Sequence, residues 1–544
     1  MAEKRDNKPF YRWVPRPAGI IVLLLMFIPP TFSGGAYLSN IGEMTGGLGV
    51  WNEDIQLAAF FTSIGMCLFV PFLVPFLQAR RIRQTYLWCF GTLAVLNIVC
   101  AETTSLPVLC GTCLVIGFVR IIVMLNCTFT IAPYLTGVNT LNMFTMTETP
   151  SPEVQYRMER MRTFLMPVLY FYILLIAQGS NVVTSWFAYN YHWQASYYAT
   201  DAMLLMAMLL VVLLMPNENR PYSYKIEWIK VPDLLLMTVA LCCMAYVLIY
   251  GKTLDWFDSL SITVCFGVML ITLGLFLWRS IKMGDRHYLP LRSFGYRNML
   301  MALAIFVISI IFNSANSFVG SFTKLTTSAD NYHAASLSAW AILGCFIGLV
   351  IALLLVVRRV RFRTTFCLAF LLMASANAYM YFQYQTEGVW SNMAIPMVLN
   401  FAGLLMLYSL TAAFSMKVLP AKYLVAAVFI MIWSRNSVAP IIGSSIYSNW
   451  LNQKQQDYVE RLSQDVNAEN VYASASYDGT RIVGQLSGKG TYEASQLAST
   501  AIKGRVAKQS AILAMKDITG TTTVLLLISA GIVLFLPYRK GETT

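Results

Sequence analysis

The sequence predicts an all-α polytopic membrane protein with fourteen transmembrane helices, arranged as two six-helix bundles plus two inserted helices. Of the 544 residues, 57% are hydrophobic and only 12% are charged, which is too few charges to cover the surface of a soluble protein. Long apolar stretches also recur from one end of the chain to the other, and about 20 apolar residues are enough to cross a bilayer.

A short basic segment occurs twice and indicates two related halves. Arg80-Arg81-Ile82-Arg83 and Arg358-Arg359-Val360-Arg361 lie 278 positions apart, each between two apolar stretches. A cysteine follows each at the same offset, namely Cys89 and Cys367. Internal repeats of this kind are typical of secondary transporters.

Each predicted span is an apolar stretch of suitable length. In chain order the spans are Ala18–Leu38, Ile55–Leu77, Gln84–Ala101, Leu106–Cys127, Phe164–Trp186, Ala195–Met215, Leu234–Tyr250, Leu260–Trp278, Met299–Phe318, Ala335–Val357, Thr364–Phe382, Met393–Phe414, Val425–Ser445 and Thr521–Leu536. The basic segment follows the second span and recurs after the tenth. We therefore expect a first bundle over 1–216, a linker with two inserted helices over 217–298, and a second bundle over 299–544.

The distribution of basic residues predicts the orientation in the cell (inner, cytoplasmic) membrane. Counted over the short loops, lysine and arginine gather on one side, whereas the other side holds only Lys252 and Lys324. By the positive-inside rule both termini are cytoplasmic, and the long loop over 449–518 lies outside. We expect helices in this loop over 458–466 and 492–515, with a turn region at its glycines. These are Gly479, Gly484, Gly488 and Gly490.

Three charged residues lie well inside predicted spans, where a charge is costly and invites a functional interpretation. Arg120 and Arg435 either contact anionic groups or hold polar networks, the alternative being packing arginines that bind helix carbonyls. Asp201 is the best candidate for a proton carrier, because burial favours the neutral form of a carboxyl and suits proton exchange. Its alternative is an aspartate at the rim, wetted by an outer vestibule.

Uncharged polar residues also interrupt the apolar spans. In hydrocarbon such side chains need a partner or a water-filled cavity, so they either join helices together or line a substrate path. The candidates for that path are Asn126, Gln178, Asn181, Asn313, Asn316, Asn400 and Asn436. The basic segments are expected to act as gates between the halves on the cytoplasmic side.

Several function classes are excluded by what the sequence lacks. It has no phosphate-binding glycine loop, no nucleophile with a base, and only three histidines, which form no metal motif with cysteine. We expect no enzyme activity, no cofactor and no metal site. The net charge of +13 is spread over loops, so nucleic acid is not an expected partner.

Several motifs in order along the chain carry a family resemblance. The arginines of the first basic segment, Arg120 in the fourth span and Asp233 at the start of the seventh span are part of it. Further residues complete the set: His192, Trp193, Tyr197, Arg435, Gly443, Val506, Gln509, Ala511 and Asp517.

With these residues the whole chain resembles the major facilitator superfamily, specifically its fourteen-helix drug:proton antiporters of the EmrB/QacA type. Two motifs depart from the family pattern: Pro29 stands where the family has an aspartate, and Ala177-Gln178-Gly179-Ser180 lacks the proline of the antiporter motif. The resemblance implies proton-coupled export of hydrophobic or amphipathic compounds by alternating access, and a periplasmic adaptor as a candidate partner. The alternatives are an uncoupled facilitator or importer on the same fold, or a non-transporting sensor or assembly partner.

Overall fold

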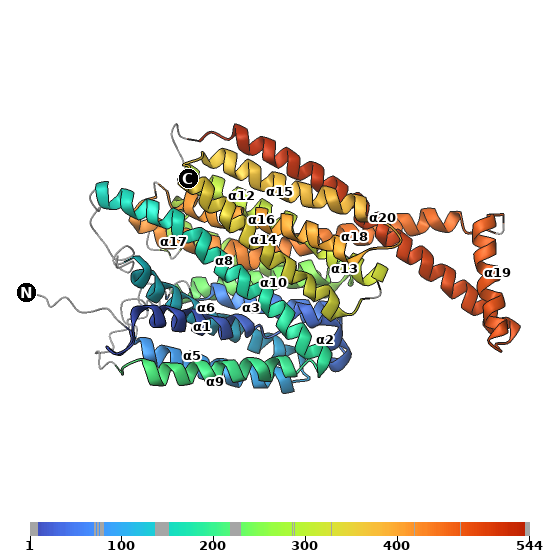
Figure 1. Cartoon of the computed structure of the whole chain (residues 1–544), viewed down its shortest axis with the longest axis horizontal. Helices are drawn as coiled ribbons and strands as arrows, with labels where there is room; N and C mark the ends of the chain where they lie inside the picture. The colour runs from blue at the N-terminus through green and yellow to red at the C-terminus, as the bar shows by residue number, and fades with distance from the viewer. Residues whose placement is uncertain are drawn as a thin grey trace, which may run out of the picture.

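The chain folds into a bundle of long helices, most of them parallel or antiparallel to one another (Figure 1). The computed structural model describes residues 9–69, 72, 76, 81–136, 152–217, 230–284, 287, 289–327, 329–417, 419–467 and 469–538. In these ranges twelve helices are long and apolar enough to cross a membrane. Large apolar side chains also remain exposed on many of them, as expected where a helix faces lipid. The chain is an integral membrane protein.

The helices follow the predicted spans. The first half contains α1 (Arg16–Phe32), α2 (Ile41–Leu48), α3 (Asn52–Cys67), α5 (Ile82–Glu102), α6 (Leu106–Thr136), α8 (Pro152–Asn190) and α9 (Ala195–Leu214). The inserted helices are α10 (Val231–Tyr250) and α11 (Leu260–Met283). The second half contains α12 (Arg297–Asn313), α13 (Ser317–Thr327), α14 (Asn331–Val357), α15 (Phe362–Gln383), α16 (Ala394–Ser415), α17 (Ala421–Trp433), α18 (Ala439–Gln464), α19 (Val471–Leu486) and α20 (Thr491–Phe535).

The predicted number of fourteen spans is not settled by these helices. Twelve are long enough to span, and the other two predicted spans coincide with α1 and α3. Helix α1 is an apolar helix of 17 residues, and α3 has 16 residues within the described ranges. Fourteen therefore stays a prediction.

Both halves use glycine to bring a pair of helices together. A Cβ on Gly117 of α6 would lie 1.9 Å from the carbonyl oxygen of Thr62 on α3. In the second half, a Cβ on Gly348 of α14 would lie 2.6 Å from the carbonyl oxygen of Ala402 on α16. Small residues allow this close backbone approach in membrane helix pairs. The two predicted halves thus share a packing mode as well as a basic segment.

The basic segments lie at the same end of the bundle, which we call the basic end. Arg81 caps α5 and Arg361 caps α15, and the hydroxyl of Thr85 or Thr365 donates to the carbonyl of the respective arginine (2.9 and 3.2 Å). These equivalent caps are 280 positions apart, whereas the sequence repeat has a spacing of 278 positions. Residues that match in the two sequences therefore differ by two positions in the structure.

The other arginines of these segments have distinct backbone positions. Arg83 lies in the first turn of α5 and Arg358 caps the end of α14. Arg359 has a left-handed backbone, with φ of 52°. Arg80 lies outside the described residues. The gating role of the segments stays a prediction.

The inserted helices join both halves. Helix α10 packs against α3 of the first half, α18 of the second and its partner α11. Lys252, just after α10, forms an ion pair with Glu53 (3.3 Å) and donates to the hydroxyl of Ser448 (3.1 Å). The hydroxyl of Ser445 donates to the carbonyl of Leu248 (2.8 Å). The insertion is therefore fixed to each half at the end opposite to the basic end.

A helical hairpin projects from that opposite end, which we call the hairpin end. It consists of the last part of α18, α19 and the first part of α20 (Figure 1). The predicted glycine-rich turn region is wrong in part, because Gly479 and Gly484 lie inside α19. A Cβ on Gly484 would lie 3.2 Å from that of Ala494, so this glycine allows α19 to pack on α20. Only Gly488, with φ of 82°, and Gly490 belong to the turn.

Candidate functional site

The helix that carries Arg435 changes its winding in the middle of the bundle. Residues Ser434–Val438 form a single π-helical turn between α17 and α18. Such turns are rare and often occur at functional sites. The sequence singled out Arg435 by its charge, but no sequence signal predicted the π-helical turn.

The guanidinium of Arg435 lies against an aromatic ring of the other half. It is 5.5 Å from the ring centre of Tyr170 on α8, and its Nε donates to Oδ1 of Asn436 (3.0 Å). The Tyr170 ring meets Tyr408 of α16 edge to face at 6.2 Å, and Tyr408 contacts Phe306 of α12 at 5.1 Å. A cation over an aromatic face is an attractive arrangement. Here it joins the two halves.

The same π-helical turn contacts α3 of the first half. The hydroxyl of Ser437 donates to the carbonyl of Ser63 (3.0 Å) and lies 3.1 Å from Sγ of Cys67. Nδ2 of Asn436 lies 3.9 Å from Sδ of Met66. Residues 435–437 therefore lie at the interface between the halves.

Arg120 belongs to the same region. It lies midway along α6, and its Nε is buried with no hydrogen-bond partner in the described ranges. Arg120 and Arg435 are within electrostatic reach of one another. We call Arg120, Arg435 and the Tyr170–Tyr408–Phe306 rings the central site.

Asp201 lies elsewhere, within the first half. Its Oδ1 accepts from Nδ2 of Asn97 on α5 (3.0 Å), and Oδ1 of Asn97 accepts from the hydroxyl of Ser33 (2.7 Å). Oδ2 of Asp201 is buried, and no residue that the structure describes forms a hydrogen bond with it; the residue is 9% exposed. Nearby, the hydroxyl of Tyr198 donates to Glu102 at the end of α5 (2.6 Å). Asp201 is thus placed toward the hairpin end, and the partners that hold it come from its own half.

Two of the predicted substrate-path asparagines bond to each other inside the second half. Nδ2 of Asn400 donates to Oδ1 of Asn313 (2.8 Å). Asn316 and Asn400 line a small pocket with room for about one water molecule. The other lining residues are Ala315, Val319, Ala376, Asn377, Met380, Tyr384, Pro396 and Thr519. None of the central-site residues is among these lining residues, so the pocket is separate from the central site.

The remaining polar candidates are dispersed. Asn126 is fully buried in α6, where its carbonyl accepts from the hydroxyl of Thr130 (2.6 Å). Gln178 and Asn181 are partly buried on α8. Among the hydrogen bonds of the described residues, Asn436 is the predicted path residue that bonds directly to a charged residue of the central site.

The sequence did not predict the contacts between the halves at the hairpin end. Nδ2 of Asn331 on α14 donates to Oε2 of Glu43 on α2 (2.8 Å), and the rings of Tyr332 and Tyr189 stack at 5.5 Å. Lys324 also donates to Asn331. Polar and aromatic residues near helix ends are ordinary in membrane proteins, so nothing distinguished these beforehand.

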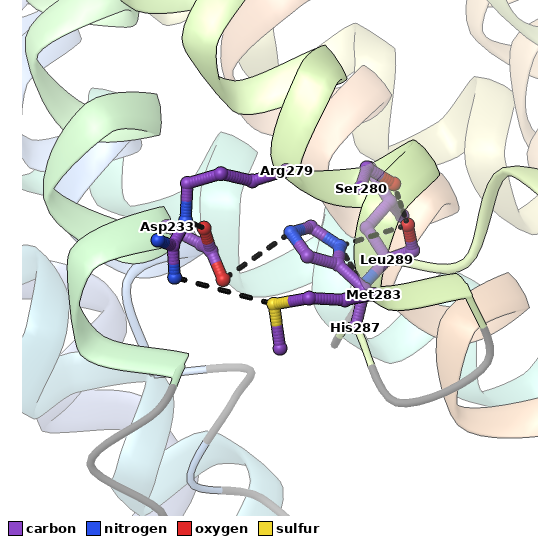
Figure 2. A network of polar contacts seen from close by, with 6 residues as sticks. All are labelled: Asp233, Arg279, Ser280, Met283, His287 and Leu289. Atoms are coloured by element: carbon purple, nitrogen blue, oxygen red, sulfur yellow. Dashed lines mark hydrogen bonds and ion pairs between the residues drawn. The ribbon is translucent and has the colours of Figure 1, made fainter.

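A buried polar network joins the inserted helices at the basic end (Figure 2). Asp233 of α10 accepts from Nε of Arg279 on α11 through Oδ1, while its Oδ2 lies 3.4 Å from Nε2 of His287. The backbone N–H of Leu289 donates to Nδ1 of His287 (3.1 Å). The hydroxyl of Ser280 on α11 donates to the carbonyl of Leu289 (3.0 Å). The sequence resemblance pointed to Asp233 but not to its partners.

His287 lies outside the membrane-spanning helices. Burial lowers its pKa, and the positive charge of Arg279 acts in the same direction. The backbone contact with Leu289 and the carboxylate of Asp233 oppose that shift. A neutral imidazole with its hydrogen on Nε2 can accept from the Leu289 N–H and donate toward Asp233, whereas a hydrogen on Nδ1 would point to the Leu289 carbonyl, 3.0 Å away. The network therefore favours neutral His287.

The comparisons define the class of fold. No protein family model matches the chain, and no curated protein matches its sequence. A solved structure of proton-dependent oligopeptide transporters is similar, with a TM-score of 0.55, 13% identity, and 96% of this chain and 98% of that chain covered. The tetrameric peptide transporter PepTSo2 has a TM-score of 0.54, 12% identity, and coverage of 96% and 98%. A mutant of the nucleoside transporter NupG has a TM-score of 0.50, 11% identity, and coverage of 94% and 98%.

At such low identity the similarity shows the fold alone. The chain has the major-facilitator-like fold of these peptide and nucleoside transporters. The predicted fold class is confirmed at that level, whereas the resemblance to the fourteen-helix drug antiporters stays a prediction.

Proposed function

We propose that the chain is a secondary transporter that exports hydrophobic or amphipathic compounds by alternating access. The observation that carries this proposal is Arg435, held on a π-helical turn in the middle of the bundle and packed against Tyr170 of the other half. A substrate between the halves would contact both of them. In transporters built from two repeats, sites at the repeat interface are opened to each side in turn by rocking of the halves.

The contacts between the halves at the hairpin end give the proposal a mechanism. Glu43–Asn331 and Tyr189–Tyr332 hold the halves together at the hairpin end. When this end opens, these contacts must separate, and the basic end must close. The arginine segments capping α5 and α15 would then act as gates at the basic end, which the positive-inside rule assigns to the cytoplasm.

Proton coupling is the finer part of the proposal, with Asp201 as the carrier. Its Oδ2 is buried near the hairpin end. Tyr198 lies near Asp201 and donates to Glu102, the last residue of α5. A second candidate is an uncoupled facilitator or importer on the same fold. It is favoured by the position of Asp201 within one half rather than in the central site.

The test is flux in proteoliposomes under an imposed pH gradient, with lipophilic dyes of positive, zero and negative charge. We expect gradient-driven flux in the wild type and its loss in Asp201→Asn. The control Asp258→Asn removes an exposed carboxylate near the hairpin end and should leave flux unchanged. Flux that ignores the gradient in both proteins would favour the uncoupled transporter. Absence of flux for every dye would contradict the proposed function.

The hairpin would be the docking surface for a periplasmic adaptor, or for an assembly partner if the chain does not transport. Its tip exposes large apolar side chains, namely Val471, Tyr472, Leu486 and Tyr492. We expect the double variant Tyr472→Ser, Leu486→Ser to transport normally in liposomes but to lose efflux from cells. Equal efflux from cells by the variant and the wild type would contradict adaptor docking at this tip.

A further inference from the structure

The central site holds two positive charges with no matching negative charge. In the part of the chain that the structure describes, neither Arg120 nor Arg435 forms an ion pair with a carboxylate. The ion pairs of lysine and arginine there are those of Lys252, Arg279, Lys454 and Arg481. Placing a charge at membrane depth is costly, and such charges usually pair with an opposite charge or with backbone carbonyls. Two arginines within electrostatic reach of one another increase that cost.

The side chains around the arginines compensate them only in part. Arg435 has the Tyr170 ring and one hydrogen bond to Asn436. Arg120 has a buried Nε with no partner among the described residues. Each guanidinium has five N–H donors arranged to meet a planar anion. Several donors at this site are therefore available to an acceptor that the described part of the chain does not supply.

We propose that the central site binds a monovalent organic anion, with its carboxylate or sulfonate between Arg120 and Arg435 and its apolar body against the Tyr170, Tyr408 and Phe306 rings. The anion supplies the missing negative charge, and the three rings, all of them buried, supply an apolar contact surface. This inference rests on the proposed function and narrows its substrate class from amphipathic compounds to amphipathic anions.

The test is equilibrium binding to the full-length protein in nanodiscs of phosphatidylcholine, which has no net charge. The probes are naphthalene-1-sulfonate and the neutral naphthalene-1-sulfonamide, which have the same aromatic body. We expect the sulfonate to bind about 10- to 100-fold more tightly, the range for charge-assisted hydrogen bonds. A tenfold excess of inorganic sulfate should displace little of it, because sulfate has no apolar body to place on the rings.

Four variants assign the preference to the two arginines. Arg120→Gln and Arg435→Gln should each lower the sulfonate-to-sulfonamide ratio by about tenfold, and Arg435→Lys should keep part of it. The control is Arg461→Gln, because Arg461 also lies over a tyrosine ring, Tyr458 at 5.8 Å, but in the hairpin. Its ratio should equal that of the wild type. Thermal unfolding of each variant with no probe present shows whether it is folded.

Some outcomes would overturn the inference. These are equal affinity for the two probes, an unchanged ratio in both glutamine variants, or displacement by equimolar sulfate, which would indicate an inorganic anion site. The inference and the proposed function fail separately. Flux of neutral or cationic dyes without anion preference would support the transporter and contradict the anion site. Arginine-dependent binding without any flux would support the anion site and contradict the transporter.

Discussion

Asp233 is expected to be one of the residues on which stability depends most. Its side chain and that of His287 are fully buried (0% exposed), and Arg279 is 31% exposed. Asp233→Asn keeps the size of the side chain but removes the charge that both partners face. Breaking a buried ion pair by removing one partner costs about 3–5 kcal/mol. Because nearly a third of Arg279 is exposed, water solvates part of its charge, and we expect a loss of about 2–4 kcal/mol.

The assay is unfolding in mixed micelles titrated with sodium dodecyl sulfate, which gives a free energy of unfolding for each variant. The control is Asp478→Asn, since Asp478 pairs with Arg481 at 3.1 Å in the hairpin, where the two side chains are 49% and 41% exposed. An exposed pair is worth about 0.2–1 kcal/mol, so this control should change little. Equal losses in the two variants would refute the argument that burial of the network makes it strong.

Three further predictions concern the inserted helices, the first bundle and the hairpin end. Because the pKa of His287 is lowered in the folded protein, the unfolded protein binds the proton more readily. Stability from neutral His287 is then present above its ordinary pKa of 6.5 and declines as the pH falls below that value. In unfolding titrations at pH 7.5 and 5.5, His287→Gln should lose less stability on acidification than the wild type, and an equal loss would contradict this assignment. Gly117→Ala should cost about 1–3 kcal/mol, because its Cβ would lie 1.9 Å from a backbone carbonyl of α3. A Cβ on Gly111 of the same helix would have no atom within 4 Å, so Gly111→Ala should change stability by less than about 1 kcal/mol. Similar losses in the two variants would show that the helices shift apart at Gly117 at little cost. Cross-linking of a Tyr189→Cys, Tyr332→Cys double variant by a short bis-methanethiosulfonate, in a cysteine-free background, should stop flux until a reductant is added, and uninterrupted flux in the cross-linked protein would show that this end need not open.

The sequence was most informative where a single physical requirement decides the structure. A helix must satisfy its backbone hydrogen bonds within the bilayer, so apolar length alone located the membrane helices. The repeated arginine segments likewise located equivalent helix starts at Arg81 and Arg361. The two-residue shift between them was not predictable, because a short basic loop carries charge without fixing its backbone register.

Where one residue type can meet two different structural requirements, the sequence does not determine which of them applies. Glycine favours turns, but it also allows helices to approach closely. Gly484 serves the second purpose in α19, whereas Gly488 serves the first with its positive φ. Which one applies depends on Ala494 of the neighbouring helix, 10 residues further along the chain. The π-helical turn at Arg435 is of the same kind, since its contacts come from α3 and α8.

The intramembrane charges show why such a signal finds candidates but not their roles. Arg120, Arg435 and Asp201 were selected by the same cost of burying charge, yet Asp201 is held by Asn97 within one half, and Arg435 meets Tyr170 of the other. Oδ2 of Asp201 and Nε of Arg120, both buried, do not form a hydrogen bond with each other. Both nevertheless lie near Tyr37, which is a common neighbour. If Asp201 carries the proton and Arg120 the anion, a change of charge at one can be felt by the other only through space, across the region around this tyrosine. Any coupling between them is then electrostatic rather than a direct transfer between ligands.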